Sequence, residues 1–195
     1  MIENNIWAGN PNQYVIGADE VGRGCFAGPI VGCAVKINYK DNEHLSDVKD
    51  SKKLTAKKRE NIFNIIENTD IEYVISICDN KQIDQYGIQK ANNVVLSESI
   101  KKLASGDEKI YVDHFNLELL NVTSLTRGED KSKAIALASI IAKVSRDNYM
   151  IKMSDKYPEY DFANNKGYGT LKHRQAIQKY GLTDLHRASF NLMPK

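Results

Sequence analysis

Two kinds of hydrophobic pattern alternate along this chain. Short apolar runs of about four to eight residues, bounded by turn residues, are typical of strands. They predict strands at residues 14–20, 30–37, 71–78, 109–113 and 122–125. Apolar positions three or four residues apart are typical of helices, and they predict helices at residues 55–66, 88–103 and 131–153. This alternation of strands and helices predicts an α/β fold.

The helix predicted for residues 131–153 is apolar nearly all round, because it contains the run A-I-A-L-A-S-I-I-A-K-V. Such a helix is expected to be buried, and its small residues permit close approach to the sheet. A chain of 195 residues is long enough for one substantial core and short for two. We therefore predict a single domain that spans residues 1–195.

Composition narrows the class of protein without identifying it. No segment approaches the length of a transmembrane helix, and the first residues lack the basic and apolar regions of a signal peptide. We therefore expect a cytoplasmic protein with no membrane partner. Cys25, Cys33 and Cys78 have no C-x-x-C spacing and are expected to be reduced thiols. The net charge of +2 neither requires nor excludes nucleic acid.

Two adjacent carboxylates, Asp19 and Glu20, end the first predicted strand. Neighbouring side chains of a strand point to opposite faces, so both acids can serve one site only if the strand stops there. Gly22 and Gly24 then let the backbone turn. The spacing from Gly17 to Arg23 also resembles a phosphate-binding loop, but such a loop needs Lys followed by Ser or Thr. We reject that alternative, and two carboxylates at a strand exit favour Mg²⁺.

A third acid, Asp113, ends the short apolar strand predicted for residues 109–113. Sites in open α/β sheets form beyond the carboxyl ends of parallel strands. If the strands that begin near Tyr14 and Lys109 are parallel neighbours, Asp113 joins Asp19 and Glu20. The spacing thus favours a metal site built from three carboxylates.

The string D-E-V-G-R-G followed by A-G-P resembles the signature of ribonuclease HII, a family of endonucleases that cut RNA paired with DNA. D-S-K-K-L, A-S-I-I-A-K-V-x-R-D, G-Y-G-T-x-x-H and the ending G-L-T-D-L-H-R-A-S-F are similar to further segments of that family, so the resemblance runs from Tyr14 to Phe190. It implies a ribonuclease H-like mixed sheet flanked by helices, with a helical C-terminal part over roughly residues 155–195. The implied partners are RNA–DNA hybrids and duplex DNA that contains ribonucleotides, and a monomer is expected.

The resemblance also implies roles for particular residues. Asp19, Glu20 and Asp113 would hold two Mg²⁺ or Mn²⁺ ions, and cleavage would leave 5′-phosphate and 3′-hydroxyl ends. The remaining residues would contact the substrate. The G-R-G turn would contact the ribose 2′-hydroxyl, and the D-S-K-K segment would contact the nucleic-acid backbone. A tyrosine would contact the sugar at the DNA–RNA junction. These residues are Gly22, Arg23, Gly24, Ser51, Lys52, Lys53 and Tyr168.

The fourth carboxylate of the family's site falls on an ambiguous position. Counting back without gaps from the A-S-I-I-A-K-V segment places it on Glu129, whereas the family's Asp favours Asp130. We favour Glu129, with Asp130 as a helix cap. Asp147 is about 25 Å along the helix from Asp130, and is expected to pair with Arg146 or Lys143.

Two alternative functions remain open from the sequence. A ribonuclease HIII-like enzyme would share the chemistry, although that group normally carries an extra N-terminal domain and favours Lys where this chain has Arg23. A nucleic-acid-binding protein of this fold with an impaired site is also conceivable, because Glu129 replaces the family's Asp. Metal-dependent cleavage distinguishes the enzymes from the binding protein.

Overall fold

The computed structural model describes residues 1–48, 54–117, 119 and 121–192, and these form a mixed sheet of five strands in the order β3-β2-β1-β4-β5. Antiparallel pairing joins β1 to β2 and β2 to β3, whereas β1–β4 and β4–β5 are parallel. The strands are β1 Val15–Val21, β2 Ile30–Ile37, β3 Glu72–Cys78, β4 Lys109–Asp113 and β5 Val122–Leu125. The strand segments predicted from the sequence are thus confirmed to within one residue at most ends, and so is the parallel pairing of β1 with β4.

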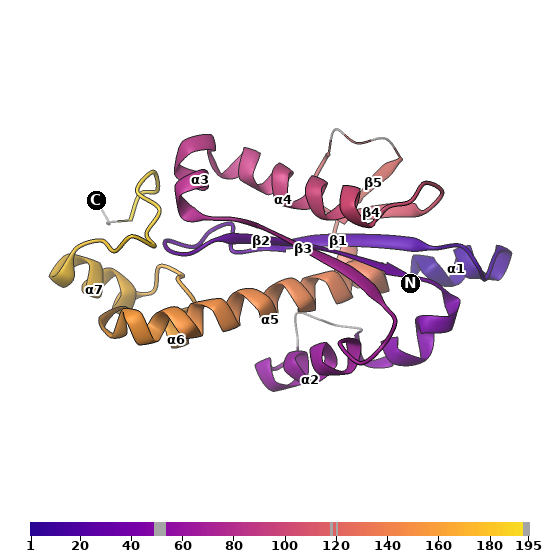
Figure 1. The fold of residues 1–195 in the computed structure, drawn as a ribbon, viewed down its shortest axis with the longest axis horizontal. Coiled ribbons are helices and arrows are strands. Elements are labelled where there is room, and N and C mark those ends of the chain that lie inside the picture. The colour runs from indigo at the N-terminus through magenta and orange to yellow at the C-terminus, as the bar shows by residue number, and fades with distance from the viewer. Residues whose placement is uncertain (49–53, 118, 120, 193–195) are drawn as a thin grey trace.

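Helices cover both faces of this sheet, with α3 and α4 on one side and α2 and α5 on the other (Figure 1). The shorter helices α6 and α7 lie beyond one end of the sheet, as expected for a helical C-terminal part. The helices are α1 Ile2–Gly9, α2 Ala56–Ile66, α3 Asn80–Tyr86, α4 Ile88–Leu103, α5 Lys133–Lys156, α6 Phe162–Asn165 and α7 Leu171–Tyr180. Short 3₁₀ helices are η1 Tyr39–Val48, η3 Gly128–Asp130 and η4 Pro158–Tyr160. No helix in the described part of the chain is long and apolar enough to cross a membrane.

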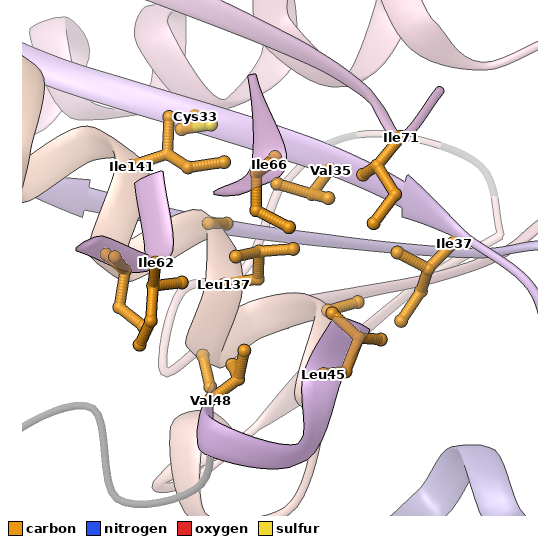
Figure 2. Close-up of a cluster of buried hydrophobic side chains, with 14 of the residues drawn as sticks. Cys33, Val35, Ile37, Leu45, Val48, Ile62, Ile66, Ile71, Leu137 and Ile141 are labelled. Atoms are coloured by element: carbon orange, nitrogen blue, oxygen red, sulfur yellow. The ribbon is translucent and has the colours of Figure 1, made fainter. Parts of the chain in front are cut away.

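The largest buried cluster lies between the sheet and the helices α2 and α5, and Figure 2 shows part of it. Side chains of β2 point toward two isoleucines of α2 and two side chains of α5. Each fully buried aliphatic side chain contributes roughly 1.5–3 kcal/mol relative to exposure, so this layer fixes α5 beneath β1. The labelled members are Cys33, Val35, Ile37, Leu45, Val48, Ile62, Ile66, Ile71, Leu137 and Ile141.

The long helix begins two residues later than its apolar pattern predicts. Residues 128–130 form the 3₁₀ turn η3, and Ser132 caps α5 by accepting a hydrogen bond from the backbone N–H of Ile135. The same serine donates to buried Glu3 of α1 over 2.6 Å, a contact that joins the N-terminus to the start of α5. The sequence analysis did not predict α1.

The three cysteines are free and buried, which confirms the prediction of reduced thiols. Burial raises the pKa of the Cys25 thiol above its ordinary value. Because the thiolate is the reactive form of cysteine, this burial disfavours reaction at Cys25.

Candidate active site

The first two acids reach one cleft although β1 does not stop at them. The strand continues to Val21 in its pairing with β2, which corrects the expectation that it ends at Glu20. Its pairing with β4 ends earlier, at the Ala18–Val112 pair. Asp19 is therefore level with Asp113, the last residue of β4, and Glu20 stands one residue past it. All three side chains border the same opening.

Asp113 and Glu129 complete a ring of four carboxylates around this cleft. Asp113 is the last residue of β4, and its Oδ1 accepts a hydrogen bond of 2.6 Å from the backbone N–H of Gly128. Glu129, the next residue along η3, is 5% exposed. The cleft has a volume of about 420 Å³ and is lined by Asp19, Glu20, Val21, Arg59, Asp113, Glu129, Ser139, Ile140, Lys143 and Tyr168.

The two candidates for the fourth carboxylate point to different places. Glu129 borders the cleft. Asp130 instead pairs with Arg127 at the surface, with Oδ2 2.8 Å from Nε and 2.7 Å from Nη2. The expectation that Asp130 caps the long helix is wrong, because Ser132 occupies the cap position.

The carboxylates repel one another in a partly dehydrated setting. Burial raises the pKa of Asp19 well above its ordinary value, and the charges of Glu20 and Glu129 raise it further, while a hydrogen bond with Ser139 of α5 opposes the rise. Burial also raises the pKa of Glu20; the Arg23 guanidinium and the Asn92 amide oppose this rise, and the charge of Asp113 adds to it. The ring therefore has an excess of negative charge that a cation would offset.

The chemistry of these donors fits a hard divalent cation. Carboxylate oxygens are the ligands that Mg²⁺ and Mn²⁺ prefer. Within the described ranges, no group of three or more His, Cys, Asp or Glu side chains already stands in a ligating arrangement. Ligation would thus require the four side chains to converge on the ion, which their mutual repulsion disfavours until the ion is bound.

Two buried arginines hold the G-R-G turn that follows β1. Arg146 of α5 donates to the carbonyl oxygens of Pro29 at 2.9 Å, Ala27 at 3.1 Å and Lys166 at 2.8 Å. Gly22 has φ +95°, and a Cβ there would lie 2.3 Å from Nε of Arg146. The turn therefore needs glycine at this position both for its backbone angle and for the space that the guanidinium occupies.

The second arginine, Arg187, approaches the same turn from the C-terminal segment. It donates to the carbonyl oxygens of Gly28 and Arg23, each over 3.0 Å. The sequence analysis considered Arg146 only as one of two possible partners for Asp147, and the structure confirms the other, Lys143, at 2.8 Å. Neither arginine was predicted to support the turn.

Tyr168 lies at the edge of the carboxylate cleft and is 40% exposed. Burial of its inner part raises the pKa of the phenol to about 12, so the hydroxyl remains a hydrogen-bond donor at any working pH. Two cations flank the ring: Nζ of Lys143 lies 5.6 Å and Cζ of Arg146 5.9 Å from its centroid. The tyrosine predicted to contact sugar is therefore beside the predicted metal ligands.

A pair of buried histidines fixes the backbone of Tyr168. Nδ1 of His173 is 2.9 Å from the carbonyl oxygen of Tyr168, and its Nε2 is 3.0 Å from Nε2 of His186. Nδ1 of His186 accepts a hydrogen bond from the backbone N–H of Thr183 over 2.9 Å. These partners assign the protons: His173 carries its proton on Nδ1, and His186 donates from Nε2 to His173. Both rings must be neutral for this chain of hydrogen bonds to exist.

The histidine pair predicts a loss of stability in acid. Burial and the neighbouring His173 lower the pKa of His186 from 6.5 to about 4, and burial also lowers that of His173. Below pH 6.5 the unfolded chain binds protons at these histidines that the folded chain does not bind. The free energy of unfolding is therefore highest above pH 6.5 and falls as the pH drops toward 4. The contribution of His186 to this decline should be at most about 1.4 kcal/mol per pH unit. Urea unfolding at several pH values measures it.

The control for this pH dependence is a comparison of slopes between variants. His186→Gln should flatten the decline below pH 6.5, whereas His44→Gln, which changes a more exposed histidine, should leave it unchanged. Equal slopes for the wild type and His186→Gln would contradict the assigned protonation.

Some predicted contacts lie outside the described residues, and other residues take part that the sequence did not single out. Ser51, Lys52 and Lys53 fall within residues 49–53, which the structure does not describe. Arg59 of α2 and Lys143 of α5 line the cleft and bring positive charge to it. Their positions on helices that flank the sheet could be found from sequence only once the packing of α2 and α5 was known.

Comparisons with known proteins agree with this fold. Residues 16–193 match the family model of ribonuclease HII. The ribonuclease HII of Clostridium beijerinckii is 43% identical over 182 residues, which are 91% of this chain and 67% of that protein. A crystal structure of the ribonuclease H2 from Pyrococcus horikoshii OT3 has a TM-score of 0.79 at 27% identity, covering 92% of this chain and 95% of the other. Bst-RNase HIII, solved in complex with Mn²⁺, has a TM-score of 0.72 at 21% identity, covering 95% and 70%; this likeness shows the fold alone.

Proposed function

This chain belongs to the ribonuclease HII family, which makes it a ribonuclease H, and we propose that it cuts two kinds of substrate. These are the RNA strand of RNA–DNA hybrids and single ribonucleotides embedded in duplex DNA. The observation that carries the proposal is the ring of four carboxylates beside Tyr168 in one cleft. We propose further that the protein works as a monomer in the cytoplasm.

The carboxylate ring is the proposed metal site. Asp19, Glu20, Asp113 and Glu129 would hold two Mg²⁺ or Mn²⁺ ions, which would activate a water molecule and stabilise the leaving oxygen of an in-line displacement. Ser139 keeps the Asp19 side chain in place through the hydrogen bond from α5. The products would carry 5′-phosphate and 3′-hydroxyl ends. The Mn²⁺ of Bst-RNase HIII is a property of that protein and lends only general support to divalent metals on this fold.

The cations around the cleft would receive the phosphates of the substrate. Arg59 of α2 and Lys143 of α5 line it from two neighbouring helices, and both are suited to phosphate oxygens. Ser51, Lys52 and Lys53 would extend this contact along the backbone of the duplex. Phosphate contacts position a duplex without reading its sequence, which suits an enzyme that recognises a sugar and not a base.

Recognition of the ribose is assigned to the G-R-G turn and Tyr168. Arg187 donates to the carbonyl oxygen of Arg23 within the turn. Arg146 packs against Gly22 and donates to the carbonyl oxygen of Pro29 just after the turn. The 2′-hydroxyl is the group that distinguishes RNA from DNA. The turn would contact one side of the sugar and the aromatic ring the other. Together they would recognise the 2′-hydroxyl next to the metal ions.

One assay tests the proposal. Duplex DNA with a single ribonucleotide is incubated with the protein and Mg²⁺, and the cut is mapped on a sequencing gel. We expect cleavage at the ribonucleotide, none on an all-DNA duplex, and none with EDTA. Binding without cleavage under saturating Mg²⁺ or Mn²⁺ would instead support the impaired nucleic-acid-binding protein. The family match argues against the ribonuclease HIII alternative.

Tyr168→Phe and Tyr168→Ala separate the ring from the hydroxyl. Loss of an aromatic stacking contact costs roughly 1–3 kcal/mol in the measured case of bases. Tyr168→Ala should therefore lower kcat/KM on a single ribonucleotide by about 5- to 150-fold, and Tyr168→Phe should retain much of the activity. Tyr180→Ala, which removes an exposed tyrosine of α7, is the control. Full activity of Tyr168→Ala would show that the ring does not contact the sugar.

A further inference from the structure

Asn92 is a buried amide that the packing of the core does not explain. It lies on α4 with 0% of its surface exposed, and neither Nδ2 nor Oδ1 has a hydrogen-bond partner in the described part of the chain. A buried polar group without a hydrogen-bond partner destabilises the folded state. Native proteins keep few such groups, and those that persist call for a structural or functional explanation.

The strand register places Asn92 beside a row of residues that ends at the carboxylate ring. Glu20 of β1 pairs with Gly32 of β2, which pairs with Ser76 of β3. Residues opposite one another in a sheet share a face. This row faces α4, because a Cβ at Gly32 would lie 2.9 Å from atoms of Val95 on that helix.

Gly32 has no side chain, and Val95 of α4 occupies the space above it. Neighbouring strands are about 4.8 Å apart, so Glu20 and Ser76 stand roughly 10 Å apart on either side of this close contact. Asn92 is one helical turn before Val95 and shares its face of α4. Ser76 is buried, and its Oγ also lacks a hydrogen-bond partner among the described residues.

We propose that Asn92 is a positioning residue for Glu20, donating from Nδ2 to the Glu20 carboxylate and accepting from Ser76 Oγ at Oδ1. The donors and acceptors run in one direction, from the serine hydroxyl through the amide to the carboxylate. One carboxylate oxygen of Glu20 is then held, and the other faces the cation. This inference rests on the proposed function, because it takes Glu20 as a metal ligand.

A second observation concerns the position of α4 over the sheet. This helix contacts β1 and β3 as well as β2, so it extends over all three strands that carry the row from Glu20 to Ser76. The buried Asn92 amide on this helix therefore lies on the face of the sheet to which both side chains belong.

Replacement by leucine separates positioning from a purely structural role. Asn92→Leu removes two buried polar atoms and keeps the volume, so stability without metal should be nearly unchanged or higher. Loss of a group that orients a ligand typically lowers metal affinity about 10- to 100-fold. Ser76→Ala should weaken Mn²⁺ binding in the same direction by a smaller factor. A structural role would instead lower stability and leave metal affinity unchanged.

The experiment measures Mn²⁺ binding to the free protein by calorimetry, without nucleic acid, together with thermal unfolding in EDTA. The variants are Asn92→Leu, Ser76→Ala and, as matched control, Asn93→Leu, whose amide oxygen accepts from Ser97 on another face of α4. We expect weaker binding for Asn92→Leu and wild-type binding for Asn93→Leu. In amide NMR spectra, the Asn92 side-chain NH₂ should shift on addition of Mg²⁺, and not in Glu20→Gln.

The outcomes distinguish this inference from the proposed function. If the wild type and Asn92→Leu bind Mn²⁺ equally well, the positioning role is wrong and the metal site is retained. No Mn²⁺ binding by the wild type would overturn the metal site, and the positioning role with it. An Asn92 NH₂ that Mg²⁺ does not move would likewise overturn the contact.

Discussion

Asp19→Asn and Asp113→Asn are each expected to lower Mg²⁺-dependent cleavage by about 10³-fold or more. A neutral amide is a poor ligand for a hard cation. Metal ions contribute several kcal/mol of transition-state stabilisation, and each 1.4 kcal/mol or so is a factor of ten in rate. Both carboxylates line the cleft, while the basic residues expected to contact phosphate are separate side chains. Binding of the duplex should therefore survive.

Asp19→Asn should also leave the protein more stable. Burial, Glu20 and Glu129 raise the pKa of Asp19, so its charge opposes folding at neutral pH. Removal of that charge should raise Tm, by about 2–4 °C for each kcal/mol regained. Single-turnover cleavage measures the rate, fluorescence polarisation with labelled duplex measures binding, and thermal unfolding in EDTA measures Tm. Asp155→Asn, on an exposed part of α5, is the matched control; near-normal turnover of Asp19→Asn in saturating Mg²⁺ would refute the assignment.

The second large effect is expected at the fourth carboxylate. Glu129→Gln should lose most Mg²⁺-dependent turnover, because Glu129 borders the cleft and its charge raises the pKa of Asp19. Asp130→Asn should cleave normally, since Asp130 is engaged with Arg127 at the surface. Such an exposed ion pair is worth about 0–1 kcal/mol. Stability should therefore change little as well.

These two variants control each other, because each replaces one carboxylate by the matching amide at adjacent positions. Initial rates at several Mg²⁺ concentrations measure the effect. An inactive Asp130→Asn together with an active Glu129→Gln would mean that η3 rearranges when metal or substrate binds, so that Asp130 and not Glu129 faces the cleft. Wild-type activity of both variants would mean that neither residue of η3 is a metal ligand.

The acids on strands could be predicted because strand ends have local signals. Asp19 and Asp113 each follow a short apolar run, and parallel pairing of those runs was enough to bring them to one edge. The extension of β1 to Val21 could not be predicted, since it depends on pairing with β2 further along the chain. Glu129 was favoured because the apolar face of the following helix fixes the register.

The groups that hold the site together left no comparable local signal. His173 and His186 form a hydrogen bond that depends on the approach of α7 to the C-terminal segment. Glu3 becomes buried only because α1 meets the start of α5. A polar residue looks solvated in sequence until the fold supplies its partner, so neither the histidine pair nor the Glu3–Ser132 contact was predicted.

The three hydrogen bonds of Arg146 give the proposed ribose pocket a preorganised shape. One planar guanidinium ties the segment after the G-R-G turn to the carbonyl of Lys166, two residues before Tyr168. The two walls of the pocket cannot open independently, so little conformational entropy is lost when a sugar enters between them. We therefore expect discrimination between ribose and deoxyribose to depend on a rigid fit of the sugar between these two walls.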